Sequence, residues 1–278
     1  MKTLIFGRGF LGHRLAESMP NSYLSDADIT RAAAVRAEIA KHQPGAVINC
    51  AGKTGTPSVD WCESHPIETY RSNVIGPLTL AEACAEAGVY LLHFGSGCVF
   101  YGVSPVPGGW REDDHANPSA LYSRTKYAAD LVLSRMPNVG IARLRMPIDS
   151  RPGPRNLITK LSRYPHVIDV ENSVTVVDDL RAVVDGLLAR RAVGVFHATN
   201  PGIMRHRDLL ALYREVVDRS HRFDLIGEED LVARGLAVSA RSNCILSSTR
   251  LDEIGLTMRP IDVALRDVML KYARAGAT

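Results

Sequence analysis

A stretch close to the N-terminus decides the fold class, and it reads Leu4-Ile5-Phe6-Gly7-Arg8-Gly9-Phe10-Leu11-Gly12. Its apolar start predicts a short buried strand, and the G-x-G-x-x-G spacing that follows opens a helical segment, Leu11–Ser18. Glycines permit a tight turn and let backbone amides approach a pyrophosphate, which a helix N-terminus also favours. A purely structural turn is the alternative, but the strand before it and the helix after it favour a dinucleotide loop. The expected contacts come from Gly7, Arg8, Gly9, Phe10, Leu11 and Gly12.

Outward from this loop, apolar β-type runs alternate with segments of helical period. Further strands are predicted at Ala46–Asn49, Tyr90–Phe94 and Ile141–Leu144, and helices at Ala32–Lys41, Ile67–Ala87 and Ala120–Arg135. Such alternation predicts an α/β fold of the Rossmann type, a doubly wound parallel sheet with ligands at the carboxyl ends of its strands. After about Arg145 the pattern is less regular. We expect residues 1–147 to form an NAD(P)-binding domain with the catalytic residues, and 148–278 mostly a substrate-binding cap that returns to the sheet near Val193–Thr199.

Bulk composition narrows the class of protein. The net charge of +3 over 278 residues does not suggest a nucleic-acid surface, and no stretch reaches the roughly 18 apolar residues of a membrane span. The five cysteines are scattered, without a C-x-x-C spacing, which argues against a disulfide framework or a zinc site and favours a reducing cytoplasm. Trp61, Cys62 and His65 lie close together, but their spacing favours helix packing. We expect no metal.

Two charged residues bear on which dinucleotide binds. Asp26 follows the presumed second strand and would favour NAD by binding a ribose diol, whereas Arg8 would favour NADP by binding a 2′-phosphate. Simple solvation of both is the alternative. We expect NADPH, with NADH as the alternative, and we expect Asp28 and Ile29 to contact adenine.

A Y-x-x-x-K spacing, Tyr122 to Lys126, falls in the helix predicted over Ala120–Arg135. Residues four apart share a helix face, so phenol and ammonium can point into one site, where the ammonium would lower the pKa of the phenol. Such a tyrosine can act as a general acid or base near neutral pH. Ser96, just after the strand Tyr90–Phe94, can hydrogen-bond a substrate carbonyl; a simple turn serine is the alternative.

Eight segments between residues 46 and 246 carry a more specific resemblance. They are Asn49-Cys50-Ala51-Gly52-Lys53-Thr54-Gly55, Val59-Asp60-Trp61-Cys62-Glu63-Ser64-His65, Arg71-Ser72-Asn73-Val74-Ile75-Gly76, Ser96-Gly97-Cys98-Val99-Phe100, Arg143-Leu144-Arg145-Met146-Pro147-Ile148, Pro154-Arg155-Asn156-Leu157-Ile158-Thr159-Lys160, Thr199-Asn200-Pro201-Gly202 and Arg241-Ser242-Asn243. With the glycine loop, Ser96, Tyr122 and Lys126, they resemble the extended short-chain dehydrogenases/reductases. Within these, they resemble the plant and viral nucleotide-rhamnose synthase/epimerase-reductase family, related to dTDP-4-dehydrorhamnose reductase and GDP-fucose synthase.

The resemblance implies an NADPH-dependent enzyme that converts a nucleotide-linked 4-keto-6-deoxyglucose to a rhamnose-type sugar by epimerising C3 and C5 and reducing C4. It implies that Ser96, Tyr122 and Lys126 are catalytic, with Cys98 and Lys160 as the epimerase acid/base pair. It further implies cofactor contacts from Cys50, Ala51, Gly52, Lys53, Tyr122, Lys126 and Met146, and substrate contacts from Thr54, Ser96, Gly97, Cys98, Asn156 and Arg241. The glycine loop is one residue shorter than is usual in the family, and Tyr101–Pro118 differs in length and composition.

Plainer roles stay open for several of these residues. In the alternative interpretation Cys98 is a packing residue and Lys160 a solvated one. Arg241 suits a pyrophosphate through bidentate hydrogen bonds, with contact to solvent as its alternative. We expect Asn73 to brace the site rather than to touch substrate. The alternative functions are a 4-keto reductase without epimerase activity and a non-catalytic cofactor-binding subunit. A homodimer is a further expectation, and the nucleotide carrier of the sugar is open.

Overall fold

The computed structural model describes residues 1–56, 58–238 and 241–276. The chain forms two compact units that interleave along the sequence. The first comprises Met1–Val99, Pro118–Arg143 and Val184–Phe196, and the second comprises Phe100–Asn117, Leu144–Val183 and His197–Thr278. The division into domains at residue 147 stays a prediction.

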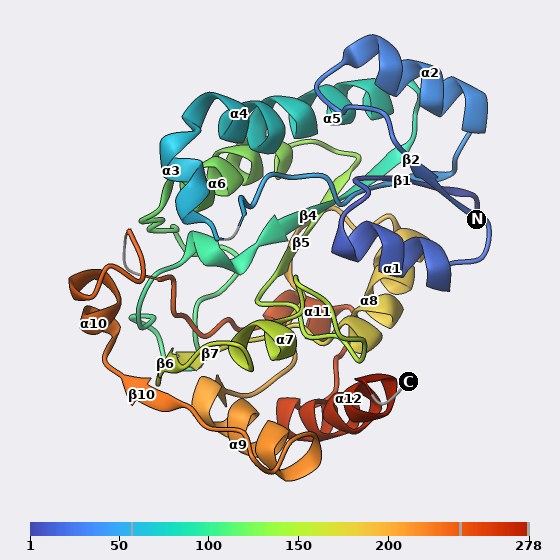
Figure 1. Cartoon of the computed structure of the whole chain (residues 1–278). Coiled ribbons are helices and arrows are strands. Elements are labelled where there is room, and N and C mark those ends of the chain that lie inside the picture. Colours follow the sequence, from blue (N-terminus) through green and yellow to red (C-terminus); the bar gives the residue numbers. More distant parts are fainter. Residues whose placement is uncertain (57, 239–240, 277–278) are drawn as a thin grey trace. The chain divides into compact units, whose positions relative to one another are not determined.

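A six-stranded sheet forms the centre of the first unit (Figure 1). Its order is β2 (Ser22–Ser25), β1 (Thr3–Phe6), β3 (Ala46–Asn49), β4 (Tyr90–Ser96), β5 (Val139–Leu144) and β8 (Gly194–His197). β1 pairs in parallel with β2 and with β3, and β3 pairs in parallel with β4. The chain reverses its direction of travel across the sheet at β1, so a ligand crevice is expected at the carboxyl ends of β1 and β3. This is the Rossmann-type sheet that the sequence predicts.

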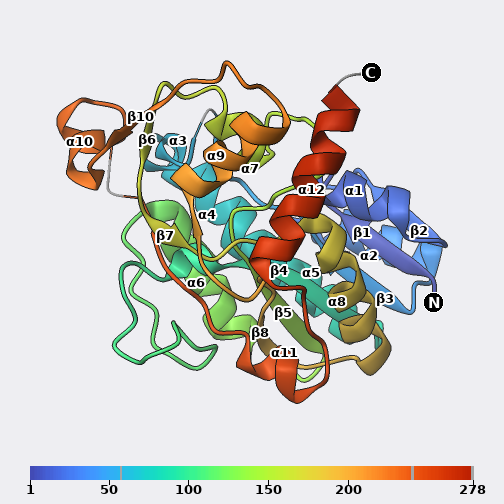
Figure 2. The ribbon, with the colours of Figure 1, turned by 90° about the horizontal axis from the view of Figure 1, so that it is seen from below.

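Helices cover both faces of this sheet. α2 (Ala32–His42), α5 (Gly76–Glu86) and α6 (Leu121–Leu133) pack side by side on one face, and α1 (Phe10–Ser18) lies on the other (Figures 1 and 2). β1, β3, β4 and β5 are buried along their whole length, as parallel strands covered on both faces must be. The apolar runs in the sequence therefore correspond to the interior of this unit.

The segment predicted as one helix, Ile67–Ala87, is interrupted in the structure. It contains the end of α4 (Pro66–Tyr70), a π-helical turn at Arg71–Ile75, and α5. Pro77 lacks the N–H that a continuous helix would use, which helps to explain the break. π-helical turns are frequent at functional sites, and this one holds the buried Asn73.

The second unit combines short strands and helices around its own apolar core. β6 (His166–Ile168) pairs in parallel with β10 (Asp224–Ile226), and β7 (Glu171–Asn172) pairs antiparallel with β9 (Met204–Arg205). Its helices are α7 (Leu157–Leu161), the first part of α8 (Val177–Arg190), α9 (His206–Val216), α10 (Glu228–Ala233), α11 (Thr249–Glu253) and α12 (Ile261–Gly276). α7, α9 and α12 contribute Ile158, Leu209 and Val268 to the core, none of which is exposed.

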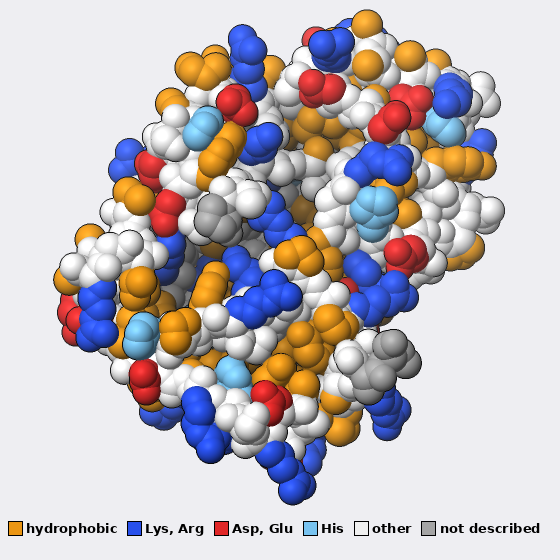
Figure 3. All heavy atoms as spheres, viewed as in Figure 1, with side chains coloured by type: hydrophobic (Ala, Val, Ile, Leu, Met, Phe, Trp, Pro, Cys, Tyr) orange, Lys and Arg blue, Asp and Glu red, His pale blue; other side chains and the backbone are white. Residues whose placement is uncertain are grey.

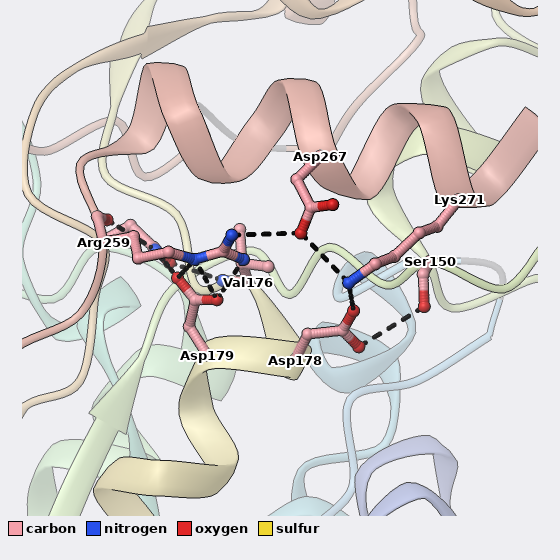
Figure 4. A network of polar contacts seen from close by, with 8 residues as sticks. Ser150, Val176, Asp178, Asp179, Arg259, Asp267 and Lys271 are labelled. Carbon is pink, nitrogen blue, oxygen red and sulfur yellow. Dashed lines mark hydrogen bonds and ion pairs between the residues drawn. The ribbon is translucent and has the colours of Figure 1, made fainter.

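A network of ion pairs joins the start of α8 to α12 within this unit (Figure 4). The Arg259 guanidinium lies 2.6 Å from Asp179 and 3.1 Å from Asp267, and Lys271 Nζ lies 3.1 Å from both Asp267 and Asp178. Isolated exposed pairs contribute only about 0–1 kcal/mol each, but bidentate pairs and networks are the exception. Arg259 contacts the nearly buried Asp179 carboxylate through both Nε and Nη2, so the network fastens the start of α8 to α12.

Charged side chains on the face seen in Figure 3 are mixed: Lys and Arg occur singly and in small groups among acidic and apolar residues. This agrees with the small net charge. Among the described helices, we find none that is long and apolar enough to cross a lipid bilayer.

Candidate active site

The glycine loop after β1 has the geometry that a pyrophosphate site needs. Gly7 has φ +101°, and a Cβ there would lie 2.3 Å from the Ala51 backbone nitrogen; a Cβ on Gly12 would lie 1.9 Å from the Gly7 carbonyl oxygen. At Gly9, by contrast, a Cβ would meet no atom within 4 Å. α1 begins directly after Gly9, and no side chain caps its first amides. A nicotinamide dinucleotide fits these residues, because glycines close the turn and leave the helix N-terminus accessible to an anion.

The residues predicted to select the dinucleotide lie at the edge of this loop. Arg8 and Asp26 are exposed. The Asp28 carboxylate accepts hydrogen bonds from the Thr30 backbone (2.9 Å) and hydroxyl (2.8 Å), which hold its pKa below the usual value. Ile29 is buried in the core of the first unit, against the start of α5. Contacts of Asp28 and Ile29 with adenine stay predictions.

Asn73 braces the segment that follows β3. Its side-chain oxygen accepts from the Lys53 amide at 2.7 Å, and its amide donates to the Lys53 carbonyl at 2.9 Å and to Thr125 Oγ1 on α6 at 3.2 Å. Asn73 thereby joins Lys53, at the end of the predicted cofactor segment, to α6. This matches the bracing role expected for Asn73.

Ser96, Cys98 and Tyr122 come together at the carboxyl end of β4. Ser96 is the last residue of β4; its hydroxyl is hydrogen-bonded to Tyr122 and accepts from the Cys98 amide at 3.2 Å. Burial raises the pKa of Tyr122, the neighbouring Cys98 raises it further, and the hydrogen bond with Ser96 opposes both. Tyr122 is therefore protonated at neutral pH, as a proton donor must be.

Lys126 departs from the sequence-based expectation. The pKa of Tyr122 is raised rather than lowered, mainly by burial, and Lys126 Nζ donates to the Phe94 carbonyl at 2.8 Å and lies 3.0 Å from His93 Nε2. Burial lowers the pKa of Lys126 to about 8, even though the nearby Asp130 carboxylate raises it. His93 was missed in the sequence, where the only signal is a titratable residue inside an apolar strand.

The remaining predicted substrate residues of the first unit lie close to Ser96 in the chain or after β3. Gly97 is buried at the start of the 3-10 turn Gly97–Val99, in which Cys98 is half-buried. Thr54 is exposed. Their contacts with a substrate stay predictions.

In the second unit, Lys160 lies on α7 near two arginines. Burial lowers the pKa of Lys160, and the charges of Arg155 and Arg241 lower it further. Three cations that repel one another mark this part of the unit as suited to an anion. Asn156 is wholly buried as the N-cap of α7, where its side chain accepts from Ile158 N at 3.1 Å and donates to the Asp149 carbonyl at 2.7 Å.

Two further predictions concern Met146, whose contact with the cofactor stays a prediction, and the absence of a metal. Met146 has φ +37° and packs, partly buried, against the core of the second unit. Over the described ranges 1–56, 58–238 and 241–276, no three His, Cys, Asp or Glu residues are grouped so that they could hold a metal ion.

A parallel sheet that opens on a glycine loop, with a half-buried tyrosine hydrogen-bonded to a serine at the end of β4, defines an oxidoreductase of the extended short-chain dehydrogenase/reductase type. Residues 1–233 match the family described as the RmlD substrate binding domain, and the chain belongs to that family.

Several known proteins are similar over most of this chain or a large part of it. The chain is 36% identical to the bifunctional dTDP-4-dehydrorhamnose 3,5-epimerase/dTDP-4-dehydrorhamnose reductase of Arabidopsis thaliana, over 97% of this chain and 91% of that protein. It is also 36% identical to the dTDP-4-dehydrorhamnose reductase of Streptomyces griseus, over 63% of this chain and 60% of that protein. The structure of the L780 UDP-rhamnose synthase of Acanthamoeba polyphaga mimivirus superimposes with a TM-score of 0.90 at 28% identity, covering 98% of this chain and 99% of that chain.

Proposed function

We propose that this protein is an NADPH-dependent 3,5-epimerase/4-reductase that converts a nucleotide-linked 4-keto-6-deoxyglucose to a rhamnose-type deoxysugar. The observation that carries the proposal is the junction at the end of β4, where a protonated tyrosine and a serine meet beside a half-buried cysteine. The tyrosine and serine hydroxyls are suited to hydrogen-bond a carbonyl oxygen, and the cysteine thiol is suited to exchange a proton on the adjacent carbon. Similarity to the bifunctional Arabidopsis enzyme along nearly the whole chain supports both halves.

The chemistry of the sugar explains why these groups belong together. The C4 ketone acidifies the protons on C3 and C5, so a base can remove them and leave an enolate. Ser96 and Tyr122 would hydrogen-bond the C4 oxygen and stabilise its negative charge. Cys98 and Lys160 would remove and return protons at C3 and C5. A lysine whose pKa is lowered by burial and by Arg155 and Arg241 is suited to accept a proton.

Reduction then needs only the groups of the first unit. Bound NADPH would supply the hydride that adds to C4. Tyr122 would give its proton to the C4 oxygen as the alcohol forms, and Ser96 would hold that oxygen in place. Arg241, together with Arg155, would bind the pyrophosphate of the sugar nucleotide.

A reductase without epimerase activity is the second candidate. It is favoured by the similarity to the Streptomyces griseus reductase, and in it Ser96, Tyr122 and Lys126 alone would carry the hydride chemistry. In that case a separate epimerase would act first, and Cys98 and Lys160 would have structural roles.

One assay separates the candidates. The protein is incubated with NADPH and 4-keto-6-deoxyglucose nucleotides carrying UDP, dTDP, GDP or CDP, with no added epimerase, and the products are identified by NMR. We expect a rhamnose-type product from at least one carrier. Reduction only of sugars that have already been epimerised would establish the second candidate, and no oxidation of NADPH with either set would contradict both.

Arg8 provides a test of cofactor choice. If its guanidinium binds the 2′-phosphate, Arg8→Ala should weaken NADPH binding by about 1–3 kcal/mol, the scale of a charge-assisted hydrogen bond. NADH lacks this phosphate, so its affinity should stay nearly unchanged. Fluorescence titration of both nucleotides measures this, and equal losses would mean that Arg8 supports the loop instead.

Two expectations about the cellular setting also belong to the proposal. All five cysteines are free thiols, which suits an enzyme of the reducing cytoplasm. A homodimer stays a prediction, to be measured by sedimentation of the purified protein.

A further inference from the structure

His93 links two elements of the site from the middle of β4, where it is wholly buried. Its Nδ1 lies 3.0 Å from Asn49 Nδ2 on β3, and its Nε2 lies 3.0 Å from Lys126 Nζ on α6. Lys126 Nζ also donates to the Phe94 carbonyl at 2.8 Å. The catalytic lysine is thus in direct contact with a buried imidazole.

The donors and acceptors in this series of hydrogen bonds fix the tautomer of His93. The Ala51 amide donates to Asn49 Oδ1 at 2.9 Å, so the Asn49 amide cannot be turned around without facing two donors toward each other. Asn49 Nδ2 therefore donates to His93 Nδ1, which must hold a lone pair. A neutral imidazole with its lone pair on Nδ1 carries its hydrogen on Nε2.

This hydrogen points at Lys126 Nζ and therefore decides the protonation state of the lysine. An ammonium group has three donors and no acceptor, so it cannot accept from Nε2–H. A neutral amine can: it accepts from His93 and still donates to the Phe94 carbonyl. The observed contacts are all satisfied only with Lys126 neutral.

The surrounding groups agree with this assignment. Burial lowers the pKa of Lys126, although the Asp130 carboxylate one turn further along α6 favours the charged form. Asp130 is itself paired with Arg143 of β5 at 2.8 Å. Burial raises the pKa of Cys50, which follows β3, so Cys50 stays a thiol beside Lys126, and Tyr122, one turn earlier on α6, stays a phenol. Burial lowers the pKa of His93 well below its ordinary value, which keeps the ring neutral.

We propose that His93 is a positioning residue whose Nε2–H holds Lys126 as a neutral amine in the nucleotide-free enzyme at alkaline pH, and that nucleotide binding at alkaline pH is accompanied by uptake of up to one solvent proton at Lys126 Nζ. The second half rests on the proposed function, because it needs NADPH at the glycine loop. The phosphate charges favour the ammonium form. Once protonated, Nζ can no longer accept from His93, so the contact between them breaks.

The tautomer can be measured without any nucleotide. Protein labelled with ¹⁵N-histidine is studied at pH 9, with His93 assigned through its backbone amide, and two-bond ¹H–¹⁵N correlations show which ring nitrogen carries hydrogen. We expect hydrogen on Nε2 and a lone pair on Nδ1. Hydrogen on Nδ1 would overturn the inference. This measurement needs no variant.

Proton uptake is measured by titration calorimetry of NADPH binding in buffers with different enthalpies of ionisation. With a pKa of about 8 for Lys126 in the free enzyme, uptake per bound nucleotide should be about 0.1 at pH 7, about 0.5 at pH 8 and about 0.9 at pH 9. The sign follows because the bound state holds a proton that the free state has lost above pH 8.

Two variants assign this uptake to His93. In His93→Gln the amide oxygen can accept from the ammonium, so Lys126 stays charged in the free enzyme and uptake at pH 9 should fall below about half of the wild-type value. His206→Gln, at another buried histidine, which lies in the second unit beside the Ile168 carbonyl, should retain full uptake. NADPH binding without proton uptake at pH 9 would contradict the inference about His93 and Lys126 and would leave the proposed function standing. Failure to bind NADPH would contradict the proposed function, and the tautomer would still decide the role of His93.

Discussion

Replacing Tyr122 by Phe should abolish NADPH oxidation while leaving NADPH affinity within a few-fold of wild type. The substitution removes one hydroxyl, which is the group that hydrogen-bonds Ser96 and carries the proton for the C4 oxygen. A positioned general acid contributes about 10²–10⁴ in rate, so kcat should fall by that factor. The ring itself is unchanged in size, and the fold should be retained. Turnover is followed by NADPH absorbance with a substrate found in the NMR assay.

Tyr127→Phe is the matched control, because Tyr127 lies on the same helix, α6. It should keep near wild-type turnover. Retention of more than about a tenth of wild-type turnover in Tyr122→Phe would remove Tyr122 from the acid role.

The raised pKa of Tyr122 also predicts a pH profile. A proton donor is active below its pKa, so Tyr122 itself should cause no loss of reductase rate between pH 7 and 10. A loss centred near pH 8 would instead report Lys126, whose pKa is about 8. The two groups can therefore be told apart by measuring kcat/KM for NADPH, which reports the free enzyme, against pH in the wild type and in His93→Gln, in which only the limb of Lys126 should move.

The parts of the site that the sequence could predict are those set by local spacing. The glycine loop can be recognised from the sequence because Gly7, Gly9 and Gly12 recur at a fixed short spacing; in the structure, close backbone approach constrains Gly7 and Gly12, and Gly9 faces open space. The Tyr122–Lys126 spacing can be recognised in the sequence because four residues make about one helical turn, which places both side chains on one face. Predicting the glycine loop and the tyrosine–lysine pair required only the order of residues along the chain and the period of the α-helix.

The parts that escaped prediction depend on which side chains meet across the sheet. His93 contacts Lys126 only because β4 and α6 pack together, and its tautomer depends on Asn49 of β3 and the Ala51 amide. The pKa of Tyr122 was expected to be lowered by Lys126; in the structure burial dominates and raises it. The spacing places the two side chains on one face, but it does not say how much water is removed from around the phenol or which partner the lysine prefers.

The second large effect is expected for Cys98→Ala, which separates the epimerase from the reductase. Cys98 is proposed to move a proton at C3 or C5, whereas reduction at C4 needs Ser96, Tyr122 and Lys126. The contact of Cys98 with Ser96 is made by the backbone amide, so alanine preserves it. Loss of one half-buried sulfur should cost only about 1 kcal/mol of stability. The variant should therefore fold and bind NADPH.

The measurement is solvent deuterium incorporation into the 4-keto-6-deoxy sugar, read carbon by carbon by NMR, alongside reduction of a sugar that has already been epimerised. Cys98→Ala should lose incorporation at C3 or C5 by about 10²-fold or more, the contribution of a general acid–base group, and should reduce the epimerised sugar at a near wild-type rate. Cys84→Ala, which removes a thiol buried in the core of the first unit, controls for the loss of sulfur. If the wild type incorporates no deuterium at either carbon, the epimerase half of the proposed function is wrong, and Cys98 packs beside Ser96 without taking part in catalysis. If wild type and Cys98→Ala incorporate it equally, the proton passes through another group, and Lys160, whose pKa burial lowers, becomes the residue to replace next.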